Sequence, residues 1–332
     1  MISLSLQPRA KKRILVFALV MSFFPGCISD VPHDNPLDPQ SPKFENAGTV
    51  RGRVLSLGSS GIANAVVSFT NSNIATLTDN NGNFSADHIS AGTMLIIVTK
   101  DGFLPDSISL QLAAGQTSSL EIHLDALPQI SSQKIITKKT DQWWPGPTYS
   151  ALVTAAVSDP DGQADIDTVF VTVDSLQFGM TYSNSDKNYQ TTIFGDSLPG
   201  SNLQSLIGKT LRVFAKDKER ALTQSGDFFI SRIIEATAVP TSPTSQDTVR
   251  GTLYFQWDPP SLNFSYTFSI NIYTLDGGVS IWFKSNIASA PPFAYTFPDT
   301  LTPRSYYWTV TVIDEFGNGA RSKEASFVVP NK

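Results

Sequence analysis

Four aspartates lie close together in one short segment: Asp159, Asp161, Asp165 and Asp167. Carboxylate oxygens are ligands that Ca²⁺ prefers, so a weak calcium candidate can be placed here. The pattern of an EF-hand loop is not met, because Gln163 stands at its fifth position and no glutamate closes the loop. The alternative is a polar turn between two strands. We favour the turn, and we predict no metal and no cofactor.

Three aromatic residues, Trp143, Trp144 and Tyr149, fall within the seven-residue stretch WWPGPTY. Flat aromatic faces stack on sugar rings, and exposed aromatic side chains mark interaction surfaces in general. These three residues are therefore candidate ligand-binding residues. In the alternative interpretation the rings fill the junction between the first two domains. A second aromatic pair, Trp282 and Phe283, is expected in a core.

Catalytic chemistry has little support in the residue types. The chain has three histidines and one cysteine, and the histidines, at positions 33, 88 and 123, show no paired spacing that would suit a metal. No nucleophile elbow, zinc-binding helix motif or phosphate-cradling glycine loop is present. We therefore predict no catalytic residue, and we expect that the protein is not an enzyme.

Cys27 is the only cysteine, and it follows a basic start and the apolar run of residues 14–24. This arrangement resembles a bacterial lipoprotein signal, with residues 24–27 (FPGC) as the lipobox. The resemblance implies a signal peptide over residues 1–26, cleavage before Cys27 and lipidation of Cys27. A plain secretory signal and an uncleaved anchor are the alternatives. The run is much shorter than the roughly 20 residues that a membrane-spanning helix needs.

Residues 27–48 are predicted to form a disordered tether, because prolines alternate with Asp, Asn and Ser and almost nothing apolar is left to bury. Ile28 follows the cysteine, where an aspartate retains many lipoproteins at the inner membrane. We therefore expect a lipid-anchored protein of the bacterial cell envelope, with the outer membrane favoured.

The balance of charge limits the possible partners. The chain has 24 basic and 29 acidic residues, and four of the basic ones lie in the predicted signal. The remaining 20 basic against 29 acidic residues give a net charge of −9. Phosphate backbones require basic surfaces, so nucleic acid is not expected as a partner. Attachment to a membrane would depend on the N-terminal lipid rather than on attraction to anionic headgroups.

Strand patterns fill the rest of the chain. Apolar residues alternate with polar ones at a period of two, and turn sequences such as Asn81-Gly82 and Asp161-Gly162 separate these stretches. We predict an all-β protein with three tandem β-sandwich domains, at residues 49–127, 128–235 and 236–332. In the last domain, Trp257 shares its inward phase with Leu253 and Phe255.

Each predicted domain resembles a known family. GTVRGRVLS, GIANAVVSF, TLTDNNGNFSA and ISAGTMLIIVTKDGF resemble the carboxypeptidase regulatory-like domain, a transthyretin-like sandwich whose fold is grouped with starch-binding domains. VSDPDG, IDTVFVTV and GKTLRVFAKDKE resemble bacterial immunoglobulin-like repeats, and TLYFQWDPP with LTPRSYYWTVTVIDEFGNGARS resembles a fibronectin type III domain. These resemblances imply structural or binding modules.

The combined expectation is a non-catalytic, lipid-anchored protein of the cell envelope that acts as a binding or display module. One alternative is carbohydrate binding through the starch-binding-like first domain and exposed aromatic residues. A second alternative is an accessory subunit of an envelope secretion or import complex. Polysaccharide and envelope proteins are accordingly the two expected classes of partner besides the membrane.

Overall fold

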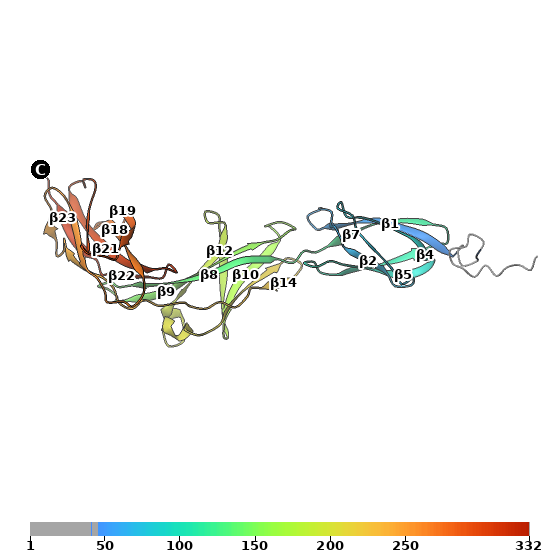
Figure 1. The fold of residues 1–332 in the computed structure, drawn as a ribbon, viewed down its shortest axis with the longest axis horizontal. Helices are drawn as coiled ribbons and strands as arrows, with labels where there is room; N and C mark the ends of the chain where they lie inside the picture. The colour runs from blue at the N-terminus through green and yellow to red at the C-terminus, as the bar shows by residue number, and fades with distance from the viewer. Residues whose placement is uncertain (1–40, 42–45, 332) are drawn as a thin grey trace, which may run out of the picture. The chain divides into compact units, whose positions relative to one another are not determined.

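The structure is a computed structural model that describes residue 41 and residues 46–331 (Figure 1). Cys27, the predicted signal peptide and most of the predicted tether lie outside the described residues. The described residues form β-strands and two short 3₁₀ segments, so the predicted all-β class is confirmed. This part of the chain contains no helix that is both long and apolar enough to cross a membrane.

Two compact units make up the described chain. The first contains the described residues up to Val54 together with Ala63–Val98 and Ser107–Ile122. The second contains Leu55–Ile62, Thr99–Asp106 and the chain from His123 onward.

The first unit is a β-sandwich of a three-stranded sheet, in the order β4-β1-β7, and a four-stranded sheet, in the order β3-β2-β5-β6. Alternate residues of the strands point inward, and their buried side chains fill the space between the sheets, as Val67, Phe69 and Ile96 do. The strands are β1 (Ala47–Ser56), β2 (Val66–Phe69), β3 (Ile74–Leu77), β4 (Asn83–Ser90), β5 (Gly92–Thr99), β6 (Asp106–Leu112) and β7 (Thr117–Leu124).

At two positions of this sandwich, the backbone requires glycine. A Cβ at Gly52 would lie 2.5 Å from the carbonyl oxygen of Leu120 and 2.7 Å from the ring of Phe84, so only glycine allows the sheet to pack here. Gly82 has a φ of 83° in the turn between β3 and β4, a conformation that side chains with a Cβ rarely adopt. The Asp79 carboxylate closes the same turn by accepting hydrogen bonds from the backbone N–H groups of Asn81 and Asn83.

The second unit begins with a sandwich built around the buried face of β9, β10 and β13. Strand β11 crosses from one sheet to the other, because residues 176–180 pair with β10 and residues 181–183 pair with β12. The elements are β8 (Gln129–Thr140), β9 (Thr148–Ser158), β10 (Ile166–Val173), β11 (Leu176–Ser183), β12 (Asn188–Phe194), η1 (Gly195–Ser197), η2 (Leu203–Leu206), β13 (Leu211–Asp217) and β14 (Leu222–Gln224).

The last sandwich packs the sheet β15-β17-β20 against strands β21, β18 and β19. Trp257, Leu253 and Phe255 are buried in its core, so the predicted inward phase of Trp257 is confirmed. Tyr306 donates a hydrogen bond from its hydroxyl to the carbonyl oxygen of Thr302 (2.9 Å), a contact typical of immunoglobulin-like corners. The strands are β15 (Val239–Ser242), β16 (Asp247–Thr248), β17 (Tyr254–Asp258), β18 (Tyr266–Thr274), β19 (Ser280–Ala288), β20 (Ala294–Thr296), β21 (Arg304–Asp314), β22 (Gly319–Arg321) and β23 (Ala325–Val329).

One strand pairing joins the two sandwiches of the second unit. β8 pairs in parallel with β22 (Figure 1). Lys138 lies opposite Gly319, and Thr140 lies opposite Arg321. The same sheet therefore continues from the strands β9 and β12 of one sandwich into β21, β18 and β19 of the other.

Candidate functional site

Trp143 and Trp144 lie on the surface of the second unit, in the loop between β8 and β9. Their exposed fractions are 71% and 87%. The alternative in which these rings fill the junction between the first two domains is therefore wrong for both tryptophans. The prolines and the glycine that follow, at positions 145–147, do not continue a strand, so the loop can present both side chains.

Contacts with the last sandwich hold the side chain of Trp143 in place, whereas within the described chain the ring of Trp144 makes no such contact. The indole N–H of Trp143 donates to the carbonyl oxygen of Glu324 (3.1 Å), and the ammonium group of Lys323 lies 4.2 Å from the centre of its ring. A cation held over a ring face attracts the electrons of that face and covers it. Among the described residues, Trp144 has no such partner, so its ring is the open one.

Tyr149 does not join this surface. It is half-buried against the core of the β8–β14 sandwich, and its hydroxyl donates to the carboxylate of Glu235 (2.5 Å). Burial raises the pKa of Tyr149 to about 12, and the hydrogen bond to Glu235 adds to the shift. Of the three predicted aromatic residues, the structure therefore leaves only the two tryptophans accessible to a ligand.

The predicted aspartates are in part brought together. Asp159, Asp161 and Asp165 lie in the turn between β9 and β10, and each belongs to a group of three carboxylates whose oxygens are all within 4.8 Å of one another. Asp167 is outside these groups; it is exposed, and its carboxylate accepts a hydrogen bond from the hydroxyl of Thr168.

Sequence reasoning missed the other acidic residues of these groups, which are Asp125, Asp217 and the exposed Glu219. Asp125 directly follows β7, and Asp217 is the last residue of β13. The three groups share members, so they form one continuous set, called here the carboxylate cluster: Asp125, Asp159, Asp161, Asp165 and Asp217, with Glu219 at its edge.

The cluster shifts the protonation of its own members. Burial raises the pKa of Asp125 to about 7, and the neighbouring charge of Asp217 adds to the shift. Burial likewise raises the pKa of Asp159 to about 6 and raises the pKa of Asp217. Both causes act in the same direction, because the loss of water and the repulsion from neighbouring carboxylates each disfavour the charged form.

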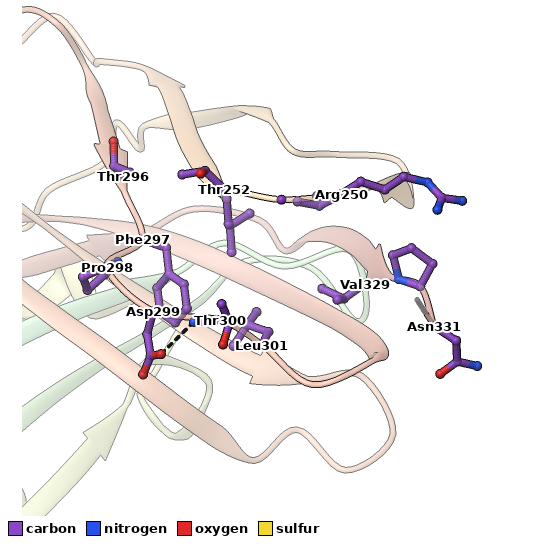
Figure 2. A pocket seen from close by; sticks show the side chains of 14 residues that line it. Arg250, Thr252, Thr296, Phe297, Pro298, Asp299, Thr300, Leu301, Val329 and Asn331 are labelled. Carbon is purple, nitrogen blue, oxygen red and sulfur yellow. Dashed lines mark hydrogen bonds between the residues drawn. The ribbon is translucent and has the colours of Figure 1, made fainter.

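An open pocket of about 840 Å³ lies at the far end of the last sandwich (Figure 2). Its lining mixes core residues such as Phe297 with loop residues such as Thr252. The carboxylate of Asp299 accepts a hydrogen bond from the backbone N–H of Thr300 (2.8 Å), and the side chain of Arg250 extends away from it in Figure 2. Convergent polar groups are the mark of a ligand pocket, and the lining residues do not form such a set.

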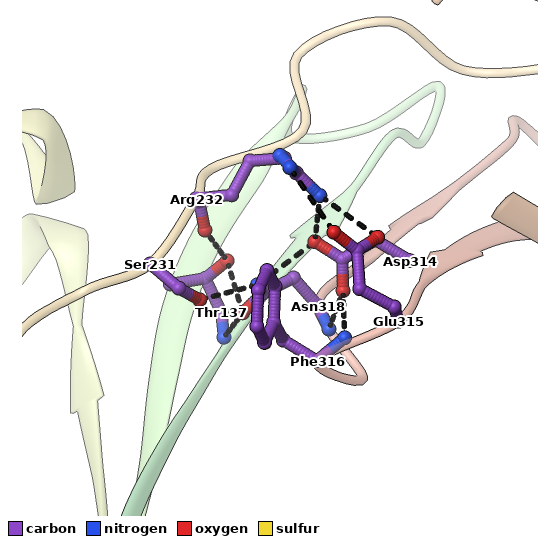
Figure 3. A network of polar contacts seen from close by, with 7 residues as sticks. All are labelled: Thr137, Ser231, Arg232, Asp314, Glu315, Phe316 and Asn318. Carbon is purple, nitrogen blue, oxygen red and sulfur yellow. Dashed lines mark hydrogen bonds and ion pairs between the residues drawn. The ribbon is translucent and has the colours of Figure 1, made fainter. Parts of the chain in front are cut away.

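A network of polar contacts connects the β21–β22 turn with β8 and with the segment before the last sandwich (Figure 3). The amide oxygen of Asn318 accepts from the backbone N–H of Thr137 (2.9 Å), and its NH₂ group donates to the hydroxyl of Ser231 (2.9 Å). The guanidinium group of Arg232 donates to the carboxylate of Asp314 (2.7 Å). Every group drawn has a partner within the network, so we assign it a structural role.

Comparison with known families supports the prediction for the first domain. The sequence profile of the carboxypeptidase regulatory-like domain matches residues 49–125. This match supports, at a coarse level, the prediction that the chain is a non-enzymatic surface or binding module. The search of curated proteins found no significant match.

Solved structures with similar folds are distant in sequence. The major pilin subunit BcpA of Bacillus cereus is 11% identical with a TM-score of 0.34, and the alignment covers 86% of this chain and 100% of the pilin. The FN1–FN3 domains of chicken CNTN1 are 9% identical with a TM-score of 0.32, covering 82% and 93%. The fibronectin(III)-like modules of Clostridium thermocellum CbhA are 12% identical with a TM-score of 0.28, covering 61% and 94%. We draw no functional conclusion from likenesses at this level.

Proposed function

We propose that this protein is a non-catalytic binding module of the bacterial cell envelope, anchored by a lipid on Cys27, with the outer membrane favoured. The anchor is supported by the position of Cys27 behind a basic and then apolar segment. The binding role is supported by the regulatory-like first domain and by an aromatic surface formed by Trp143 and Trp144.

The observation that carries the binding role is the exposure of Trp144. An indole that is 87% exposed leaves a large apolar surface in water, which is unfavourable unless a partner covers it in use. Trp143, fastened by Glu324 and Lys323, fixes the residue next to it. The ligand would therefore contact the ring of Trp144 on a loop that Trp143 attaches to the last sandwich.

A flat open ring favours carbohydrate as the ligand, because sugar rings present flat C–H faces to aromatic side chains. One stacked ring contributes on the order of 1 kcal/mol, so a single site would bind with a dissociation constant near ~1 mM. An envelope protein is the other ligand class, as in an accessory subunit of a secretion or import complex.

The lipid anchor is tested by metabolic labelling. The full chain and its Cys27→Ser variant are expressed in a Gram-negative host that is fed labelled palmitate. We expect label in the wild-type protein and none in the variant, because the thiol is the acylated group. Equal labelling of both proteins would refute the anchor.

The ligand is tested with the full chain in a non-ionic detergent. Soluble glucans and peptidoglycan fragments are titrated while tryptophan fluorescence is recorded, and envelope proteins are captured in a parallel experiment. The test variant is Trp144→Ala. The control is Phe283→Ala, which removes a different exposed aromatic side chain, 57% exposed, from the same unit.

Sugar binding that is lost in Trp144→Ala and kept in Phe283→Ala supports the carbohydrate function. Capture of one envelope protein with the same dependence on Trp144 supports the accessory-subunit function instead. If neither ligand class depends on Trp144, the aromatic surface is not a binding site, and the proposed function has lost its main support.

A further inference from the structure

The carboxylate cluster of the second unit contains oxygens without any hydrogen-bond donor. Asp217 is fully buried, and its Oδ2 has no partner among the described residues. The same holds for one buried oxygen of Asp159, one of Asp165 and both oxygens of Asp125. Leaving a buried acceptor unpaired is unfavourable, and more so if it is charged, so these oxygens are expected to bind a ligand.

Positive charge from the protein does not supply that ligand. Within the described part of the chain, none of the five aspartates has a lysine or arginine within 4.0 Å, whereas seven other ion pairs are formed there. Several carboxylates pressed together without a cation repel one another strongly. A bound multivalent cation removes this repulsion and gives the unpaired oxygens a partner.

We propose that Asp125, Asp159, Asp161, Asp165 and Asp217 form a calcium site at the turn between β9 and β10 of the β8–β14 sandwich. The inference does not depend on the proposed ligand-binding role of Trp144. The three groups of carboxylates share Asp125, Asp165 and Asp217, each of which belongs to two of them. A carboxylate that belongs to two groups can contribute an oxygen to a cation bound at either of them.

The chemistry of the donors selects Ca²⁺. All are carboxylate oxygens, and no histidine or cysteine belongs to any of the groups, so a site for zinc or copper is disfavoured. Ca²⁺ accepts six to eight oxygens in flexible geometry, whereas Mg²⁺ demands an octahedron and keeps several waters. A set of five buried or half-buried carboxylates, with Glu219 at its edge, matches the first cation.

The site would hold together chain segments that are distant in the sequence. Asp161 accepts hydrogen bonds from the backbone N–H groups of Gly58 (2.9 Å) and Ala126 (2.7 Å). Gly58 comes from the segment Leu55–Ile62, which belongs to the second unit. Calcium at Asp125 and Asp161 would therefore hold this segment and the residues just before β8 against the turn between β9 and β10.

Calorimetric titration tests the proposal. The full chain in non-ionic detergent is treated with EDTA, dialysed and titrated with CaCl₂ and, separately, MgCl₂. We expect a dissociation constant for calcium between ~1 μM and ~1 mM, weaker binding of magnesium, and a calcium-dependent rise in the melting temperature. Tryptophan fluorescence reports the melting of the second unit, because all five tryptophans belong to it.

Asp165→Asn and Asp217→Asn are the test variants, since asparagine keeps the shape and removes the charge. We expect each to weaken calcium binding at least about tenfold, because the number of charged ligands sets the affinity. Asp167→Asn is the matched control, because Asp167 is two residues from Asp165 and outside the groups. It should bind calcium like the wild type.

A purely structural role for the cluster makes a different prediction. The asparagine variants would then change the melting temperature without calcium and leave the response to calcium unaltered. That result, an absence of calcium binding up to ~10 mM, which lies above the range of extracellular calcium modules, or magnesium binding as tight as calcium binding would overturn the proposal.

Discussion

Trp257 and Trp144 lie at opposite ends of the range of burial in this chain. Trp257 is 3% exposed and meets Phe268 edge-on, with 5.2 Å between the ring centres. Trp144 is 87% exposed and has no ring contact among the described residues. The same side chain therefore contributes to stability at one position and is available for binding at the other.

Replacing Trp257 with alanine should destabilise the last sandwich by about 3 to 5 kcal/mol, the usual cost of emptying an aromatic core position. Urea unfolding followed by the fluorescence of the remaining tryptophans, of which Trp308 is fully buried in the same core, measures the change. The control is Trp144→Ala, which should change stability by less than about 0.5 kcal/mol. A loss under about 1 kcal/mol in Trp257→Ala would contradict the burial of this ring.

The candidate sites were only partly predictable from the sequence. The stretch 159–167 revealed the aspartates of one turn but gave no reason to separate Asp167 from the rest. For two members of the carboxylate cluster, Asp159 and Asp217, the two-residue period of the preceding strand predicts an inward side chain. Val153, Ala155 and Val157 continue inward to Asp159, and Leu211, Val213 and Ala215 continue inward to Asp217. Asp125 gave no such signal, because only the tertiary fold brings it to the turn.

At the scale of elements, the turn between β21 and β22 works as a connector. Asn318 is fully buried within it and links three parts of the chain: β8 through Thr137, the segment 231–232 through Ser231, and its own turn through Asp314. Each of its amide atoms that can form a hydrogen bond has a partner. A buried polar network of this kind is stable while every member is satisfied.

Replacing Asn318 with alanine should cost about 2 to 4 kcal/mol, because Thr137 loses the acceptor for its buried N–H and Ser231 loses a donor. Thermal and urea unfolding measure the change. Arg304→Ala is a suitable control, since Arg304 pairs with Asp276 on the surface at 3.7 Å and should contribute less than about 1 kcal/mol. Equal effects of the two variants would mean that the network is not a stabilising connector.

The type of the elements followed from the sequence better than the fate of single side chains. The two-residue period predicted an all-β chain, which the structure confirms. The expectation that Trp282 and Phe283 both lie in the core was wrong for Phe283, which is 57% exposed, while Trp282 packs against the core. Adjacent residues of a strand point to opposite faces, so β19 could bury only one of them.

At the scale of the whole chain, the second unit holds two separate hydrophobic cores, and one continuous sheet contributes strands to both. Separate cores usually allow separate unfolding. Here the pairing of β8 with β22 and the network around Asn318 connect them. The free energy of unfolding of one sandwich therefore depends on whether the other is folded.

We therefore expect the two sandwiches of the second unit to unfold in a single transition. Differential scanning calorimetry of the full chain shows the number of transitions, and tryptophan fluorescence identifies those of the second unit. The Asn318→Ala variant should split this transition into two, because it weakens the connection. Two well-separated transitions in the wild type, unchanged in the variant, would show that the sandwiches are independent.

The parallel direction of β8 and β22 also decides how the second unit responds to mechanical force. The paired residues run from Lys138 to Thr140 on one strand and from Gly319 to Arg321 on the other. A pull that draws the two sandwiches apart along these strands loads the hydrogen bonds in shear, so they must break together rather than one after another. Forced separation is governed by the rate of that step rather than by equilibrium stability.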